Sequence, residues 1–138
     1  MSDGSNSPKI VLALIEKGKK FLLIKRKVAG ITELRWAFPG GTVGDAETNE
    51  QAVLRHAKAE VGQEVEIKEK LLERIHPDTQ FSVSYFYCIP STNSSAEVGE
   101  PHEIDNVEWV AANEVTSRFT TNVDPEIKKF LSSFSSPQ

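Results

Sequence analysis

The sequence predicts an α+β domain in which a mixed β-sheet is sandwiched between helices, an α/β/α arrangement. Two observations carry this prediction. Short apolar segments typical of strands occur before and after one long amphipathic segment with capping residues at its ends, and a shorter helical pattern closes the chain. In addition, 138 residues suffice for one hydrophobic core, and no internal repeat divides them.

Both ends of the chain are polar and rich in small residues. Residues 1–8 contain no apolar stretch of the kind found in secretory signals, and residues 134–138 show no apolar period. We therefore expect a flexible N-terminal tail over residues 1–8, a single domain over residues 9–133 and a flexible C-terminal tail over residues 134–138.

The first two apolar runs, residues 10–15 and 21–26, flank a polar stretch that contains Gly18. Two strand-like runs around a short glycine-containing turn predict a β-hairpin. Polar residues 27–35 then indicate a connection. We expect the Pro-Gly-Gly of residues 39–41 to end any strand, because proline lacks an amide donor and glycine allows unusual backbone angles.

The clearest helix is predicted between Thr48 and Gly62. Thr48 and Gln51 have the spacing of a capping box, and Gly62 stands where a helix C-terminus favours a left-handed residue. We expect the helix to bury one apolar stripe, about 100° wide on a helical wheel. Four residues form this stripe: Val53, Leu54, Ala57 and Val61.

The rest of the chain shows strand, loop and helix patterns in turn. Strands are predicted at residues 65–76, 80–89 and 104–110, and a loop at residues 91–99. The first two of these strands meet at a Pro-Asp turn, and the second keeps a strict period of two. A short final helix is expected to begin at Asp124 and Pro125, with Ile127, Phe130 and Leu131 facing inward.

Composition excludes several classes of protein. Twenty acidic residues against sixteen basic ones give a net charge of −4, the wrong sign for gripping a nucleic-acid polymer, although a small phosphorylated substrate is allowed. No apolar run approaches the ~20 residues needed to span a membrane. Cys88 is the only cysteine, which excludes an internal disulfide and a multi-cysteine zinc site and indicates a cytoplasmic protein.

The long helix carries a carboxylate at the border of its apolar stripe. Glu60 lies about 20° from Val53 on the helical wheel, and His56 lies one turn earlier on the same side. A carboxylate at the edge of a core requires a partner, either a lysine or arginine or a metal ion. From the residues alone, both alternatives stay open.

The segment from Gly41 to Gly62 resembles the Nudix box, G-x5-E-x7-R-E-U-x-E-E-x-G-U with U apolar, through Gly41, Glu47, Arg55, Glu60 and Gly62. The flanking segments are also similar to that MutT-like family: residues 21–26, 36–41 and 103–110. The resemblance implies the Nudix fold. It also implies a metal-dependent hydrolase of a nucleoside diphosphate linked to another group, such as a nucleotide sugar or a nucleoside triphosphate.

The box departs from the family pattern at three positions, where this chain has His56, Ala59 and Gln63. In the family, glutamates at the first two positions act with the one matching Glu60 to hold two or three magnesium ions. The resemblance therefore implies a reduced metal site. Alternatively, His56 completes a histidine–glutamate pair with Glu60, which suits Mn²⁺ or Zn²⁺ better than Mg²⁺.

This altered box resembles that of GDP-mannose mannosyl hydrolases, which hold a single Mg²⁺. By position, that branch implies Glu60, the carbonyl of Gly40 and Glu103 as ligands of Mg²⁺ or Mn²⁺. Its catalytic base falls on Ile104 here and does not transfer. His102 then becomes the candidate base, with simple solvent exposure as its alternative.

The resemblance also implies roles for further residues. Arg26 matches a strand-end arginine that contacts substrate phosphates, the alternative being a solvated surface charge. Arg55 orients the box carboxylates in the family, the alternative being a surface ion pair with Glu47 or Glu60. The expected catalytic set is therefore Glu60, Glu103, Arg55 and His102. Arg26, Glu47 and Phe38 form the expected substrate-binding set, Phe38 by stacking on a base, with a place in the core as its alternative.

Two main hypotheses for function follow. The first is a hydrolase that uses Mg²⁺ or Mn²⁺ on a small nucleotide substrate. The second is a Nudix-fold module that binds a nucleotide or a protein partner without hydrolysis, because two box carboxylates are missing. A triphosphatase for oxidised nucleotides is a third. Since many members of the family pair, a homodimer is also expected.

Overall fold

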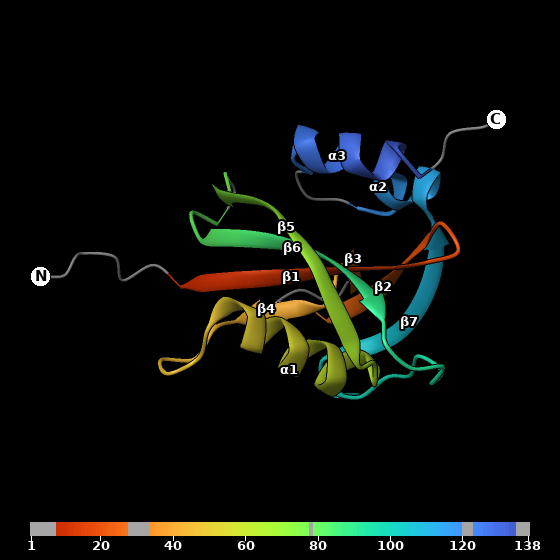
Figure 1. The fold of residues 1–138 in the computed structure, drawn as a ribbon, viewed down its shortest axis with the longest axis horizontal. Coiled ribbons are helices and arrows are strands. Elements are labelled where there is room, and N and C mark those ends of the chain that lie inside the picture. The colour runs from red at the N-terminus through yellow and green to blue at the C-terminus, as the bar shows by residue number, and fades with distance from the viewer. Residues whose placement is uncertain (1–7, 28–33, 78, 120–122, 135–138) are drawn as a thin grey trace, which may run out of the picture.

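The computed structural model describes residues 8–27, 34–77, 79–119 and 123–134. In these ranges a seven-stranded sheet carries helices on both faces (Figure 1), which confirms the predicted α+β class. The predicted N-terminal tail, residues 1–8, is described only at Pro8, and the predicted C-terminal tail, residues 134–138, only at Phe134, whose ring packs against Phe21, Tyr87 and Phe130. Residues 28–33 of the predicted connection and Asp78 lie outside the described residues. The elements in chain order are β1 Lys9–Lys17, β2 Lys20–Lys27, β3 Leu34–Ala37, β4 Gly40–Thr42, α1 Asn49–Val61, β5 Val65–Ile75, β6 Ser82–Pro90, β7 Ile104–Ala111, the 3₁₀ turn η1 Ala112–Glu114, α2 Val115–Arg118 and α3 Pro125–Ser132.

Strand β1 organises the sheet. It pairs antiparallel with β2 in the predicted hairpin, antiparallel with β4, and parallel with β6. From β6 the sheet continues to β5, and from β2 it continues to β3 and β7, all in antiparallel pairs. The parallel pair of β1 and β6 needs a long crossover, which α1 and β5 supply. The sheet is therefore mixed, as expected.

Each face of the sheet packs against its own helix. Helix α1 covers one face and α3 the other, with α2 beside α3 (Figure 1). Burial of the apolar side chains between these layers is the main stabilising contribution to the fold. On the α1 side the helix contributes Ala52, Val53, Ala57 and Val61, and on the α3 side the helix contributes Ile127 and Leu131.

Helix α1 begins and ends where its capping residues predict. The side chain of Thr48 accepts a hydrogen bond from the Gln51 amide at 3.0 Å, and the Gln51 side chain accepts one from the Thr48 amide at 2.9 Å. Gly62 adopts a left-handed φ of 67°. The expected apolar stripe is wrong at one position, because Leu54 is 44% exposed while Ala52 takes its place in the core.

The predicted loop at residues 91–99 packs over the end of α1. The Gly99 amide donates to the Glu60 carbonyl at 2.9 Å, and the Glu97 amide donates to the Val61 carbonyl at 3.0 Å. Gln63 is buried, and its Nε2 donates to the Ser94 carbonyl at 2.9 Å. The box position that is apolar in the family pattern thus holds this loop by a hydrogen bond, which fixes the C-terminal turn of α1.

Several short elements carry no local signal in the sequence. Strand β3 ends at Ala37 before Pro39, as expected, but β4 begins at Gly40, where no strand was predicted. Turn η1 and helix α2 were also not predicted. These elements have three or four residues each, and the two strands depend on pairing with distant residues of β2 and β1.

In the described part of the chain, the model contains no helix with the length and apolar character required to cross a membrane.

Candidate functional site

The carboxylate of Glu60 is the buried charge around which the site is built. Glu60 is only 3% exposed, near the end of α1. Its Oε1 accepts hydrogen bonds from the Gly40 amide at 3.1 Å and from Arg26 Nη2 at 3.2 Å. A buried carboxylate is stable only when such donors replace water. The alternative of an arginine partner, left open by the sequence, is therefore realised in this structure.

The second oxygen of Glu60 is held by His56. Nδ1 of the ring lies 3.0 Å from Glu60 Oε2, and Nε2 lies 2.8 Å from the Thr42 carbonyl oxygen. A carbonyl and an ionised carboxylate only accept hydrogen bonds, so both contacts are satisfied when both ring nitrogens carry a proton. The hydrogen bond to Glu60 accordingly raises the pKa of His56 above its usual 6.5, against the effect of burial. The surroundings of the His56 ring therefore favour its protonated form.

This arrangement predicts a pH-dependent stability. Because the pKa of His56 is raised in the folded state, its contribution is complete below its usual value of 6.5 and is lost as the pH rises through the folded value. The free energy of unfolding, measured by urea titration in EDTA, should fall as the pH rises above 6.5, and His56→Gln should reduce this slope. An NMR titration in which the His56 ring loses its proton below 6.5 would contradict the prediction.

Gly41 provides the space for this histidine. A Cβ atom built on Gly41 would lie 2.7 Å from Cε1 of the His56 ring, closer than two such atoms approach. Strand β4 and α1 can therefore come together at the ring only with glycine at this position. The first glycine of the box, Gly41, is therefore required in this chain by its close packing against His56.

Arg26 joins three of the predicted site residues. Its guanidinium, 28% exposed at the end of β2, donates to the Gly40 carbonyl at 3.2 Å and to Glu60 Oε1 at 3.2 Å. Nη1 of Arg26 lies 3.7 Å from Glu103 Oε1. Oxygens from Gly40, Glu60 and Glu103 therefore surround a single positive group. Arg26 belongs to β2, Gly40 to β4 and Glu60 to α1. Glu103 lies on the turn before β7.

The same three oxygens match one divalent cation in chemical type. Two carboxylates and a carbonyl are hard ligands of the kind that Mg²⁺ prefers, with water and substrate oxygens completing its shell. Among the described residues, no group of three or more histidine, cysteine, aspartate or glutamate side chains is arranged to hold a metal. Glu60 and Glu103 with the Gly40 carbonyl are therefore the residues whose chemistry suits a divalent cation here.

Glu47 and Arg55 form an ion pair with each other. Arg55 Nε and Nη2 donate to the two Glu47 oxygens at 2.6 and 2.7 Å, and the Gly44 amide donates to Glu47 Oε1 at 2.8 Å. These hydrogen bonds, that of Arg55 first, lower the pKa of Glu47 to about 2. Arg55 Nη2 also donates to the Thr42 carbonyl at 3.2 Å. The pair therefore positions the carbonyl that holds His56.

His102 and Glu103 lie on a turn at the entrance to the site. The Glu103 and Ile104 amides donate to the Glu100 carbonyl at 3.0 and 2.9 Å, and the Lys27 amide donates to the Glu103 carbonyl at 2.8 Å. The turn is thereby attached to the end of β2, next to Arg26. Both side chains are exposed, so they stand where a substrate or solvent can reach them.

Phe38 lies apart from the Glu60 cluster, in the core on the α3 side of the sheet. It is 3% exposed, and its ring packs on Phe119 at a centroid distance of 5.1 Å. A cavity of about 100 Å³ opens beside these rings. Its lining is made of Leu12, Trp36, Ala37, Phe38, His76, Tyr85, Phe119 and Val123. Tyr85 and Phe119 were not predicted for the site, since a distant strand and an irregular segment bring them there.

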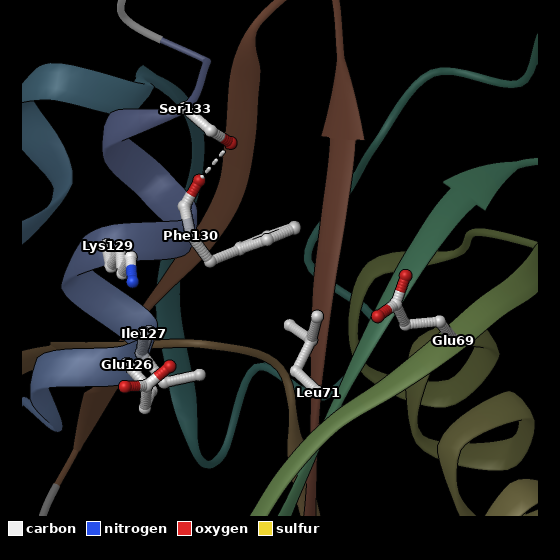
Figure 2. Close-up of a pocket in the computed structure, with 7 residues that line it drawn as sticks. All are labelled: Glu69, Leu71, Glu126, Ile127, Lys129, Phe130 and Ser133. Atoms are coloured by element: carbon white, nitrogen blue, oxygen red, sulfur yellow. Dashed lines mark hydrogen bonds between the residues drawn. The ribbon is translucent and has the colours of Figure 1, made fainter.

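A second, larger groove lies between α3 and β5. It has a volume of about 320 Å³, and Figure 2 shows Phe130 and Leu71 extending into it, with the Glu69 and Glu126 carboxylates on opposite sides. Lys129 and Ser133 complete its rim, but none of the predicted site residues lines it. The convergence of charged groups therefore identifies the Glu60 region as the candidate site.

The chain is similar to known proteins over nearly all of its length. A family model described as the NUDIX domain matches residues 7–134. No curated protein sequence matches the chain at a significant level.

Three of the solved structures with a similar fold are given as examples. A NUDIX hydrolase from Nitrosomonas europaea has a TM-score of 0.79 and 22% identity, covering 95% of this chain and 73% of that chain. A MutT protein from Methanosarcina mazei Go1 has a TM-score of 0.70 and 19% identity, covering 97% and 96%. A UDP-X diphosphatase has a TM-score of 0.66 and 19% identity, covering 97% and 64%. At these identities the similarity shows the fold alone.

Proposed function

This chain belongs to the NUDIX domain family, and from that premise we propose that it hydrolyses a nucleoside diphosphate linked to another group, with one divalent cation, Mg²⁺ or Mn²⁺. The observation that carries this proposal is the convergence of Gly40, Glu60 and Glu103 oxygens on one positive group, Arg26. Such a set suits a substrate that brings its own negative charge together with a metal.

The charged side chains have separate roles in binding a diphosphate. Glu60, Glu103 and the Gly40 carbonyl would hold the cation, which when bound supplies charge neutralisation to the diphosphate and its leaving group. The guanidinium of Arg26 offers parallel N–H donors that match phosphate oxygens. His102, exposed next to Glu103, is the proposed acceptor of a proton from the attacking water.

The aromatic cavity is the proposed site of the nucleobase. Phe38 lies two residues before Gly40, so one short segment of backbone connects the wall of this cavity, on the α3 side of the sheet, with the charged cluster, on the α1 side. Flat apolar walls with Trp36 and Phe119 suit a base that stacks. Nucleotide sugars are favoured as substrates by the altered box, which resembles that of GDP-mannose mannosyl hydrolases, and the fold is shared with a UDP-X diphosphatase.

A second candidate function, ligand binding without hydrolysis, is favoured by one specific observation. Both oxygens of Glu60 already contact basic side chains, Oε1 with Arg26 and Oε2 with His56. A carboxylate neutralised in this way attracts a metal less strongly than one of several neighbouring acids. A nucleotide whose phosphates contact Arg26 directly would need no metal.

Turnover of a mixed panel separates the candidates. Nucleotide sugars, normal triphosphates and oxidised triphosphates such as 8-oxo-dGTP would be incubated with Mg²⁺, Mn²⁺ or EDTA, and the products resolved by chromatography. Metal-dependent turnover of one class is expected, and its products identify the bond that is cleaved. Tight nucleotide binding in EDTA, with no product in any mixture, would replace the hydrolase by the binding module.

A further inference from the structure

The guanidinium of Arg26 stands at the position where the proposed cation would bind. Its Nη2 is 3.2 Å from the Gly40 carbonyl and 3.2 Å from Glu60 Oε1, and its Nη1 is 3.7 Å from Glu103 Oε1. These oxygens are the complete protein ligand set of the proposed function. A guanidinium and a divalent ion cannot share them, because two like charges at this spacing repel each other.

Of the groups that hold Glu60, Arg26 is the one able to leave. The Gly40 amide is part of β4, and the ring of His56 is fixed from its other side by the Thr42 carbonyl, which Arg55 also contacts. The side chain of His56 is 12% exposed, against 28% for Arg26. A long, partly exposed side chain can move to a nearby phosphate without disturbing the fold.

We propose that Arg26 and a divalent cation are alternative occupants of one site, so that the ligand-free chain supplies its own cation there. Arg26 leaves the three oxygens when a substrate diphosphate offers it new acceptors, and the vacated oxygens become available to the metal. Metal and diphosphate then strengthen each other's binding, beyond their own attraction. This inference rests on the proposed function, since it assigns the same ligands.

The test measures Mn²⁺ binding to the nucleotide-free protein by the EPR signal of unbound Mn²⁺. Arg26→Ala should bind Mn²⁺ about tenfold more tightly than the unmodified chain, because charge-assisted hydrogen bonds of this kind no longer compete. Arg26→Gln, which is neutral and similar in size, is a second variant with the same expected direction. Adding Glu60→Gln to Arg26→Ala should abolish the gain.

Lys25→Ala is the matched control. It removes the same charge from the neighbouring residue of β2, where Lys25 Nζ lies 5.6 Å from the centroid of Trp36 rather than against Glu60. If Lys25→Ala and Arg26→Ala gain Mn²⁺ affinity equally, the effect comes from the overall charge of the protein, and the proposal is overturned. If the unmodified chain binds Mn²⁺ and Arg26→Ala binds it no better, the exchange is wrong but the metal site stands. If no form binds Mn²⁺, both fail.

Discussion

Glu60→Gln should lower kcat/KM on the order of 10²–10³-fold for any substrate that the panel identifies, an effect typical of removing one preorganised charged group. The carboxylate is buried and is the point where Gly40, Arg26 and His56 meet. An amide in its place carries no charge. Its own N–H group would also face one of these N–H donors, and two donors form no hydrogen bond with each other. Steady-state kinetics with Mg²⁺ measures the loss, and urea unfolding shows how much of the protein is folded.

Glu64→Gln is the control for this substitution. Glu64 follows the end of the same helix, but its side chain is 62% exposed and its ion pair with Lys58 is long, at 3.9 Å. Such surface pairs contribute little to stability, so activity should stay within about twofold of the unmodified chain. If folded Glu60→Gln turns over substrate at an unchanged rate, the Glu60 carboxylate takes no part in the reaction. The box segment of this NUDIX fold would then have no catalytic role.

The sequence pattern correctly predicted the elements whose formation depends on interactions between residues close in sequence. The Thr48 capping box and the left-handed Gly62 bound α1 as predicted, and the hairpin around Gly18 formed. Leu54 was misplaced because the buried face of α1 is turned toward Ala52, which lies on the opposite side of the predicted stripe from Leu54. Strands β3 and β4 were missed, since residues 34–37 and 40–42 become strands only through their partners in β2 and β1.

The sequence named candidate residues for the site but did not predict most of the contacts among them. Spacing placed His56 one turn from Glu60, and the structure joins them at 3.0 Å. What one sequence could not give is that Arg26 reaches Glu60 across 34 residues, or that the Thr42 carbonyl contacts the second nitrogen of the His56 ring. Both depend on how β2 and β4 lie beside α1, which is a property of the folded sheet.

Gly40→Ala should destabilise the fold by about 3 kcal/mol or more, since strain and overlap act together at one position. Gly40 has a φ of 153°, where side chains are rarely tolerated. A Cβ atom there would overlap the carbonyl oxygen of Val11 and approach Leu12 Cα at 2.9 Å, both in the central strand β1. Urea unfolding followed by circular dichroism measures the change.

Gly18→Ala separates strain from overlap. Gly18 also has a positive φ, 60°, but a Cβ atom there meets nothing within 4 Å, so this substitution should cost only about 1 kcal/mol. The difference between the two variants then reports the close approach of β4 to β1. That approach aims the Gly40 amide and carbonyl at Glu60 and Arg26, so Gly40→Ala should also lose activity in its folded fraction. Equal costs for both variants would show that β4 can move away from β1, and the carbonyl would then not be a fixed ligand.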